Sequence, residues 1–146
     1  MIALFLLFLL NSSQLIVVEI STQRLYFFEN SVLIKKIPIS TAKSGYFTPT
    51  GRFRIVAKFP VVFSKRRGNA KLIYWLGFTK NGYYGIHAFP NCEYEKYLGK
   101  KNSTGCIRVS RKDGRWLFKK VKIGTPVIIT DFLILLYKAN LLFNFS

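Results

Sequence analysis

The stretch LIVVEISTQRLYFFENSVLIKKIPI, residues 15–39, predicts that the domain begins with antiparallel β-strands. It contains three segments rich in β-branched and aromatic side chains, LIVVEI, RLYFF and VLIKKIPI, and such segments favour strands. The polar run Ser21-Thr22-Gln23 separates the first two segments, and Glu29-Asn30-Ser31 provides a turn before the third. We therefore expect an opening antiparallel hairpin whose outer positions carry Lys35 and Lys36.

Strand and turn signals continue through the middle of the chain. In TPTGRFRIVAKF, residues 48–59, a Pro and a Gly mark a turn, after which apolar and basic residues alternate. The segments LIYWLGF (72–78) and NGYYGIHAF (81–89) are joined through Asn81-Gly82, a dipeptide typical of a β-hairpin turn. The apolar VIIT that follows Pro126 predicts a closing strand.

Only one segment, at about 110–122, predicts an α-helix. Ser110 can cap its first turn, and Asp113 three residues later completes a capping-box pattern. Apolar residues then recur at helical spacing, and Gly124 is expected to end the helix. The chain is therefore predicted to be mainly β with one principal helix.

Composition and charge indicate one ordered domain with a strongly basic surface. The chain has 146 residues, half of them hydrophobic, which is enough for one core and too few for two domains of ordinary size. Its 23 Lys and Arg against 6 Asp and Glu give a net charge of +17, which attracts nucleic acid, anionic membranes or acidic wall polymers. The sequence contains no helix-turn-helix, zinc-finger or RNP pattern, so no specific nucleic acid is expected as a partner.

Two apolar segments, residues 1–13 and 132–146, flank the predicted domain. The run Ile2–Leu10 is shorter than the about 20 residues that a membrane-spanning helix needs. We interpret residues 1–13 as a signal-like segment or a membrane-proximal anchor, with a buried strand as the alternative. Lys138 interrupts the apolar tail. Residues 14–131 then form the domain itself, expected in the cell envelope, in the periplasm or on the outer face of the cytoplasmic membrane.

The motif NSTGCIRVS, residues 102–110, is the strongest sign of chemistry in the chain. Its Cys106 follows a turn in which a glycine lets the backbone bend and expose amide N–H groups beside the sulfur, as an oxyanion requires. A thiol nucleophile also needs a base, and His87 is the one histidine. Taken singly, each residue also fits a purely structural role. Together with Cys92 their spacing matches no common zinc motif, so no metal is expected.

The joint pattern resembles the L,D-transpeptidase family, the YkuD-like catalytic domain of peptidoglycan enzymes. That family has a histidine followed, after a variable loop, by S-x-G-C-[IV]-R, matched here by His87 and by STGCIR at 103–108. The segments STQRLYFFEN, FTPTGRFRI, IYWLGF and IGTPVII are also similar to the family, so the resemblance covers roughly residues 15–131. It implies a sandwich of mixed or antiparallel β-sheets with one principal helix, and catalysis without a metal or organic cofactor.

The resemblance also implies roles for individual residues. Cys106 would be the nucleophile and His87 the base, with a backbone carbonyl near Ser103 orienting the imidazole. The amides of Gly105 and Cys106 would form the oxyanion hole, and Arg108 would brace the loop or bind a substrate carboxylate. The other substrate-binding candidates are Thr104 and the cleft aromatics, Tyr74 with Trp75 or Tyr83 with Tyr84, for which core packing is the alternative.

Three positions depart from the family pattern. Thr104 stands where many members have a histidine, and Ala88 stands where many have a glycine after the first histidine. Cys92 has no family role, although a disulfide between Cys92 and Cys106 would switch off catalysis.

The implied reaction is acyl transfer on peptidoglycan stem peptides, in cell-wall biogenesis and the maintenance of cell shape. The thiolate would attack the carbonyl between the third stem residue, commonly diaminopimelate, and D-alanine. The acyl group of the thioester would then pass to another stem, to an envelope protein or to water. Carbapenem β-lactams would inhibit the enzyme. The alternatives are an L,D-carboxypeptidase, a cysteine peptidase, a catalytically inactive wall-binding domain and a basic nucleic-acid-binding module. The products that the protein releases distinguish them.

Overall fold

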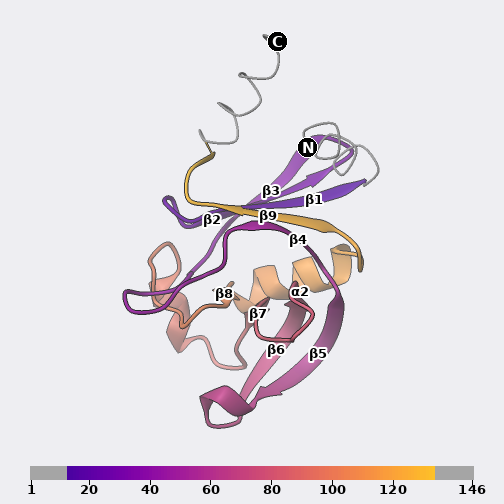
Figure 1. Cartoon of the computed structure of the whole chain (residues 1–146). Coiled ribbons are helices and arrows are strands. Elements are labelled where there is room, and N and C mark those ends of the chain that lie inside the picture. Colours follow the sequence, from indigo (N-terminus) through magenta and orange to yellow (C-terminus); the bar gives the residue numbers. More distant parts are fainter. Residues whose placement is uncertain (1–12, 134–146) are drawn as a thin grey trace.

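The computed structural model describes residues 13–133 of the chain. They form two β-sheets with one α-helix, α2 (Arg111–Lys120), packed against the second sheet (Figure 1). The prediction of a mainly β fold with mixed sheets and one principal helix is thus confirmed. The apolar segments 1–12 and 134–146 lie outside the described residues. Within residues 13–133, no helix has the length and apolarity needed to cross a membrane.

The first sheet contains the predicted opening hairpin and has the strand order β3-β2-β1-β9-β4. Its strands are β1 (Gln14–Glu19), β2 (Arg24–Glu29), β3 (Val32–Pro38), β4 (Gly51–Arg54) and β9 (Pro126–Thr130). The pairs β1–β2 and β2–β3 are antiparallel, as expected, whereas β1 and β9 run parallel. The sheet is therefore mixed, and its last strand in sequence lies between β1 and β4.

The second sheet has the order β5-β6-β7-β8 and carries the candidate site at β7 and β8. Its strands are β5 (Ala57–Ser64), β6 (Ala70–Gly77), β7 (Gly85–Ala88) and β8 (Ile107–Arg108). The 3-10 turn η1 (Lys65–Arg67) joins β5 to β6, and the predicted Asn81-Gly82 turn lies between the antiparallel strands β6 and β7. Because β7 and β8 are parallel, the chain between them, with η2 (Glu93–Tyr97), crosses over before it returns beside β7.

Helix α2 begins as predicted but ends earlier. Ser110 Oγ accepts a hydrogen bond from Asp113 N–H and donates one to the Asp113 carboxylate, both at 3.0 Å. The helix stops at Lys120 because Val121 takes an extended conformation and buries its side chain in the core. Gly124 does not end the helix as predicted; its φ of +92° turns the chain toward β9 instead.

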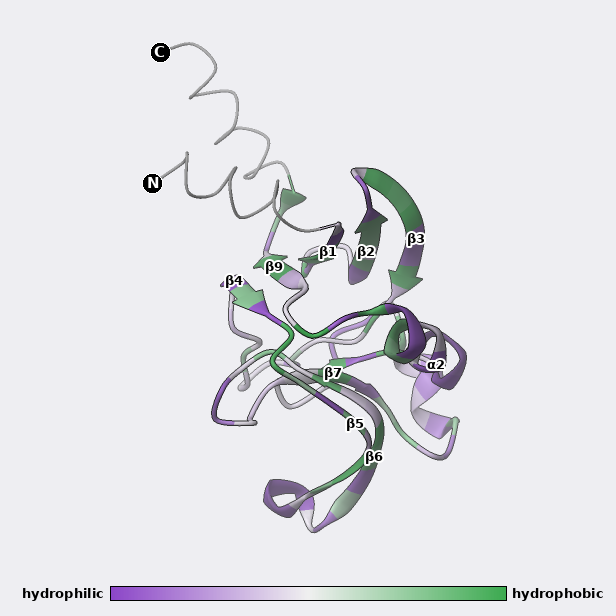
Figure 2. Ribbon diagram, turned by 90° about the vertical axis from the view of Figure 1, so that its right-hand side faces the viewer, coloured by the Kyte–Doolittle hydropathy of each residue, from purple (hydrophilic) through white to green (hydrophobic). Residues whose placement is uncertain are grey.

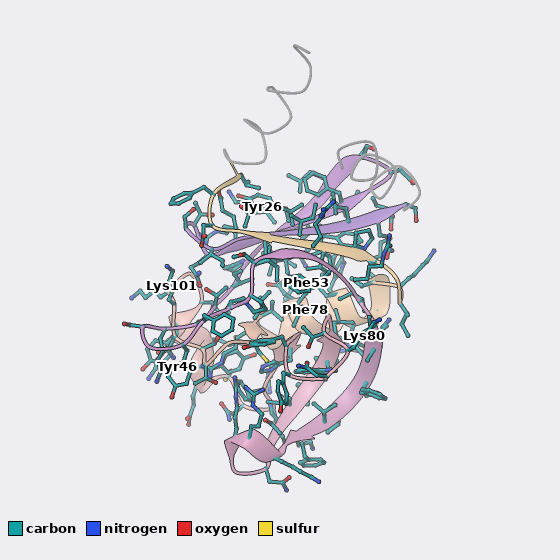
Figure 3. The ribbon with its side chains drawn as sticks, in the orientation of Figure 1. Tyr26, Tyr46, Phe53, Phe78, Lys80 and Lys101 are labelled. Atoms are coloured by element: carbon teal, nitrogen blue, oxygen red, sulfur yellow. The ribbon has the colours of Figure 1, made fainter. Side chains whose placement is uncertain are left out.

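The core lies between the two sheets and against α2. Figure 2 shows the apolar composition of the strands that supply it, and in Figure 3 Phe53 and Phe78 meet between the sheets with ring centroids 5.2 Å apart. Its buried members include Ile16, Val18, Leu25, Phe27, Ile37, Ile39, Ile55, Leu76, Ile86, Ile107, Val109, Leu117 and Val127. Full burial of such side chains contributes about 1.5–3 kcal/mol each before conformational entropy is subtracted. This packing fixes the strands that hold the site.

Candidate active site

Strand β7 and the bend before β8 bring His87 and Cys106 to the same face of the second sheet. In the parallel pair, Ile86 of β7 lies opposite Ile107 of β8, and both are buried in the core between the sheets. Because successive strand residues point to opposite faces, His87 points away from that core. Cys106 lies in the bend directly before β8. Both contact Trp75 of β6 there. The indole stacks on the His87 ring with centroids 5.8 Å apart, and it packs with Cys106 in a separate cluster.

Two glycines make room for this indole. A Cβ added at Gly77 would lie 2.8 Å from Trp75 Nε1, and one at Gly85 would lie 2.7 Å from the Trp75 ring. A side chain at either position would therefore push the indole from its place against His87.

Cys106 is a free, buried thiol. It is 4% exposed, and its Sγ donates to the carbonyl oxygen of Tyr83, 3.5 Å away. Cys92 is also free but exposed, so the two cysteines form no disulfide. Burial raises the pKa of the Cys106 thiol, an effect that the positive charge of Arg67 opposes. The thiol is protonated at neutral pH and needs a base to become a nucleophile.

The hydrogen bonding of His87 defines which of its ring nitrogens can accept a proton. The side chain is fully buried, and Nδ1 lies 3.0 Å from the carbonyl oxygen of Ala88. A carbonyl only accepts hydrogen bonds, so Nδ1 carries the hydrogen and Nε2 has the free lone pair. Nε2 is buried and has no hydrogen-bond partner within residues 13–133. The orienting carbonyl is therefore that of Ala88, which corrects the prediction of a carbonyl near Ser103.

The surroundings of His87 keep its imidazole neutral. Burial lowers the pKa to about 3; the Ala88 carbonyl opposes this shift, and the charges of Arg67 and Arg108 add to it. Phe89 covers another side of the ring, edge to face with centroids 5.0 Å apart. A neutral imidazole is the form that acts as a base.

Because of this neutral imidazole, we expect the free energy of unfolding to decrease as the pH falls from about 6.5 toward about 3. In the unfolded chain the histidine takes up a proton near pH 6.5, whereas folded His87 does so only near pH 3. The unfolded state thus binds more protons in this window and is favoured as the pH falls. Urea unfolding of wild type and His87→Ala at a series of pH values measures the effect. The variant should show the flatter profile, and equal slopes would contradict a buried neutral imidazole.

Ser103 and Gly105 shape the turn that holds Cys106. Ser103 Oγ accepts from the Gly105 N–H at 3.0 Å and donates to the Cys106 carbonyl at 2.6 Å. Thr48 Oγ1 donates to the Gly105 carbonyl at 2.8 Å. Gly105 has a φ of +140°, and a Cβ there would lie 2.8 Å from the Tyr84 ring. The Gly105 N–H is engaged inside the turn, which corrects its predicted place in an oxyanion hole. Among the described residues, the Cys106 N–H donates to no protein acceptor.

Aromatic side chains border this turn. Tyr84, a predicted substrate-binding residue, lies against Gly105, and its ring contacts Phe47 with centroids 5.9 Å apart. Phe47 is 66% exposed, and the adjacent Tyr46 lies on an outer loop of the molecule (Figure 3). Thr104 is half-buried within the turn. The turn therefore has an aromatic wall with one exposed ring.

Arg108 braces the loop, one of its two predicted roles. Its Nη1 donates to the carbonyl of Asn102 at 3.2 Å, and its guanidinium lies 5.2 Å from the centre of the Phe89 ring. Its Nε is buried without a hydrogen-bond partner in residues 13–133. That nitrogen remains available to a ligand.

A bulge in β6 directs Tyr74 away from Cys106 and Trp75 toward it. The pairing register of β6 and β7 shifts at this point, and Tyr74 has a φ of +57°. The Tyr74 ring contacts Phe118 of α2, with centroids 5.9 Å apart. Of this predicted pair, the structure brings Trp75 to Cys106 and places Tyr74 against the helix.

Sequence reasoning did not single out several residues near the site, namely Phe47, Thr48, Arg67 and Phe89. A signal existed for Phe89, because it follows His87 by two positions and so shares its face of the strand. Phe47, Thr48 and Arg67 reach the site from connecting segments between strands. In such segments the spacing of apolar residues does not indicate which way a side chain points. Within the described part of the chain, no three His, Cys, Asp or Glu side chains come together as a metal ion would require.

Comparison with known proteins relates most of the chain to one family. The profile of the YkuD family, the L,D-transpeptidase catalytic domain, matches residues 13–129. A Bacillus licheniformis protein assigned as the L,D-transpeptidase YkuD is 36% identical over 115 residues, which cover 79% of this chain and 64% of that protein.

Solved structures are similar over the same region. An L,D-transpeptidase from Mycobacterium smegmatis superposes with a TM-score of 0.75 at 25% identity, over 81% of this chain and 58% of that one. The L,D-transpeptidase LdtMt1, solved in complex with imipenem, superposes with a TM-score of 0.75 over 81% of this chain and 59% of that one. At 22% identity, this second likeness concerns the fold alone. The chain spans less than two thirds of the length of each of these three proteins.

Proposed function

Because the chain belongs to the L,D-transpeptidase catalytic-domain family, we propose that it is a peptidoglycan L,D-transpeptidase in which Cys106 carries the acyl group. The observation that supports this most strongly is the hydrogen bonding of His87. The Ala88 carbonyl holds Nδ1, while Nε2 is buried without a partner among residues 13–133. On the same sheet face as a buried thiol, such a nitrogen is equipped to take the thiol proton.

The proposed reaction begins when His87 Nε2 takes the proton from Cys106 Sγ. The thiolate attacks the carbonyl carbon between the third stem residue and D-alanine, and the Cys106 N–H donates to the resulting oxyanion. The C–N bond breaks as the imidazolium gives its proton to the leaving amine, which releases D-alanine and leaves a thioester on Cys106. An acceptor amine then attacks the thioester, loses a proton to His87 and forms a new amide, and the thiol is restored.

The acceptor that we propose is the amine of a second stem, which produces a cross-link between two third residues. The lysine of an envelope protein and water are the competing acceptors. The net charge of +17 suits an anionic wall polymer as the surface on which the protein works.

Mass spectrometry of purified peptidoglycan incubated with the protein tests this function. We expect free D-alanine together with new cross-links between third residues. D-alanine without cross-links would instead identify an L,D-carboxypeptidase, and cleavage of an ordinary peptide without D-alanine release would identify a cysteine peptidase. An unchanged digest would contradict the proposal.

We also propose that carbapenems acylate Cys106. The similar LdtMt1 was solved in complex with imipenem, which is a carbapenem. The strained β-lactam amide presents the same kind of carbonyl to the thiolate as the stem does, so acylation needs the same two residues.

The proposed substrate lies outside the cytoplasm, so we expect residues 1–20 to direct export. Their apolar run Ile2–Leu10 has the character of a signal segment. The test is a fusion of residues 1–20 to a reporter that is active only after export, with Leu6→Arg in the apolar run as the matched control. We expect the reporter to be active when it is fused to the unchanged residues 1–20 and inactive when the fusion carries Leu6→Arg. A reporter that stays in the cytoplasm with both sequences would contradict this localisation.

A further inference from the structure

Three arginines act electrostatically on Cys106 in the folded chain, although they come from two distant parts of the sequence. Arg66 and Arg67 belong to η1, at the tip of the β5–β6 hairpin (Figure 1), and Arg108 follows the cysteine by two residues. The Arg66 guanidinium lies 4.2 Å from the centre of the Tyr83 ring. The carbonyl of that same tyrosine accepts a hydrogen bond from the Cys106 thiol, so Tyr83 contacts both the hairpin tip and the nucleophile.

Two of these arginines present buried donors without acceptors. Arg67 Nη1 and Arg108 Nε are shielded from solvent and have no hydrogen-bond partner within residues 13–133. Buried donors normally find an acceptor. The positive charges of Arg67 and Arg108 also act on both reacting groups, because each charge favours a lower pKa of Cys106 and of His87.

Among residues 13–133, no carboxylate forms a salt bridge with one of these arginines. The salt bridges found in residues 13–133 are Lys35 with Asp113 and Lys120 with Glu29, and neither includes one of the three arginines. A guanidinium presents its N–H donors in a fork that matches a carboxylate. The vacant donors and the positive charge of the arginines are therefore complementary to an anionic group close to the bond that Cys106 attacks.

We propose that Arg66, Arg67 and Arg108 form a subsite for a carboxylate of the acyl donor. This inference rests on the proposed function. A stem donor offers one carboxylate on the departing D-alanine, next to the bond that breaks, and another at the far end of a third-position diaminopimelate side chain. Either would accept the vacant donors of Arg67 and Arg108 and hold the carbonyl against the thiol. Arg67 is the arginine to substitute in a test of the subsite. Arg108 is less suitable because it also braces the motif through the Asn102 carbonyl.

The test compares Arg67→Gln with wild type on three synthetic tetrapeptide donors that end in diaminopimelate–D-alanine. One donor has both carboxylates free, one has the D-alanine carboxylate amidated, and one has the diaminopimelate side chain amidated. Removal of a charged hydrogen-bond partner should lower kcat/KM for the free donor by about ten- to a hundredfold. For the donor that lacks the bound carboxylate, the variant and wild type should agree within about threefold. The donor that shows this agreement identifies the carboxylate.

Two further variants separate charge, geometry and folding. Lys65→Gln removes one positive charge from the same turn, where Lys65 is exposed, and should change kcat/KM of each donor by less than about threefold. Arg67→Lys keeps the charge without the fork and should fall between wild type and Arg67→Gln. An equal loss for all three donors with Arg67→Gln, or no loss with any, would overturn the subsite.

Donor binding to Cys106→Ala, measured by calorimetry with and without Arg67→Gln, provides a readout that needs no turnover. Tighter binding of the free donor than of one amidated donor, abolished by Arg67→Gln, supports the subsite even if wild type releases no D-alanine. Selective donor binding without D-alanine release would therefore reject the proposed function and retain the carboxylate subsite. Equal binding of all three donors to Cys106→Ala would reject the inference, whatever the turnover.

Discussion

Cys106→Ala is expected to lose all transfer activity, a decrease of about 10³-fold or more, while the fold remains intact. The chemical reason is that no other group can carry the thioester. The fold tolerates the change because the side chain is small and lies in a minor cluster with Leu72 and Trp75, where its hydrogen bond to the Tyr83 carbonyl is a long 3.5 Å. Removing a small buried group of this kind should lower the free energy of unfolding by about 1 kcal/mol.

D-alanine release and urea unfolding, measured on the same preparation, check this expectation. Cys92→Ala is the matched control, because Cys92 is the exposed cysteine and should be replaceable without effect. Retained D-alanine release in Cys106→Ala would remove the cysteine from the mechanism. Lost activity together with a collapsed fold would remove the evidence for a chemical role.

His87→Ala is expected to abolish nearly all acylation of Cys106 at neutral pH. The chain has one histidine, so no other imidazole can take the proton. An ordinary thiol has a pKa of about 8.5, and burial raises the pKa of Cys106, so little thiolate forms at pH 7 without the base. Higher pH should restore part of the acylation by ionising the thiol directly, beginning only above the range of an ordinary thiol.

The two kinds of acyl donor should respond differently to this rescue. A stem peptide still needs a proton for its departing amine, whereas the strained ring of a β-lactam opens with less help. Stopped-flow acylation by a carbapenem and D-alanine release from a tetrapeptide, both followed from pH 7 to pH 10, separate these steps. Rescue should be greater for the carbapenem. Wild-type acylation by His87→Ala at pH 7 would show that the loop amides and arginines activate the thiol without His87.

The elements that the sequence predicted well are those set by local chemistry. Segments rich in β-branched and aromatic residues, with polar turns between them, predicted the opening antiparallel hairpin. Asn81-Gly82 predicted its turn, and Ser110 with Asp113 predicted the start of α2. The helix end was missed because it depends on Val121, whose burial in the core outweighs the local signal of Gly124. Tertiary packing decided that boundary.

Within the site, residue identities were predictable and hydrogen-bond directions were not. The motif singled out Cys106 and His87, which the fold brings to one sheet face. The orienting carbonyl of Ala88 and the engaged N–H of Gly105 depend on how the turn and the strand end are folded, which residue types alone do not define. Arg67 was missed for a similar reason, since KRR in a loop resembles an ordinary solvated surface until the hairpin places it beside Cys106.

Peptide mapping after carbapenem treatment tests the central claim, that Cys106 is an activated nucleophile, most directly. Trypsin separates the two cysteines, because Cys106 lies in NSTGCIR (102–108) and Cys92 lies in NGYYGIHAFPNCEYEK (81–96). Simple thiol exposure favours Cys92, whereas catalytic activation favours the buried Cys106. We predict one adduct per chain, on the peptide 102–108. An adduct on the Cys92 peptide, or an unmodified peptide 102–108, would contradict the account.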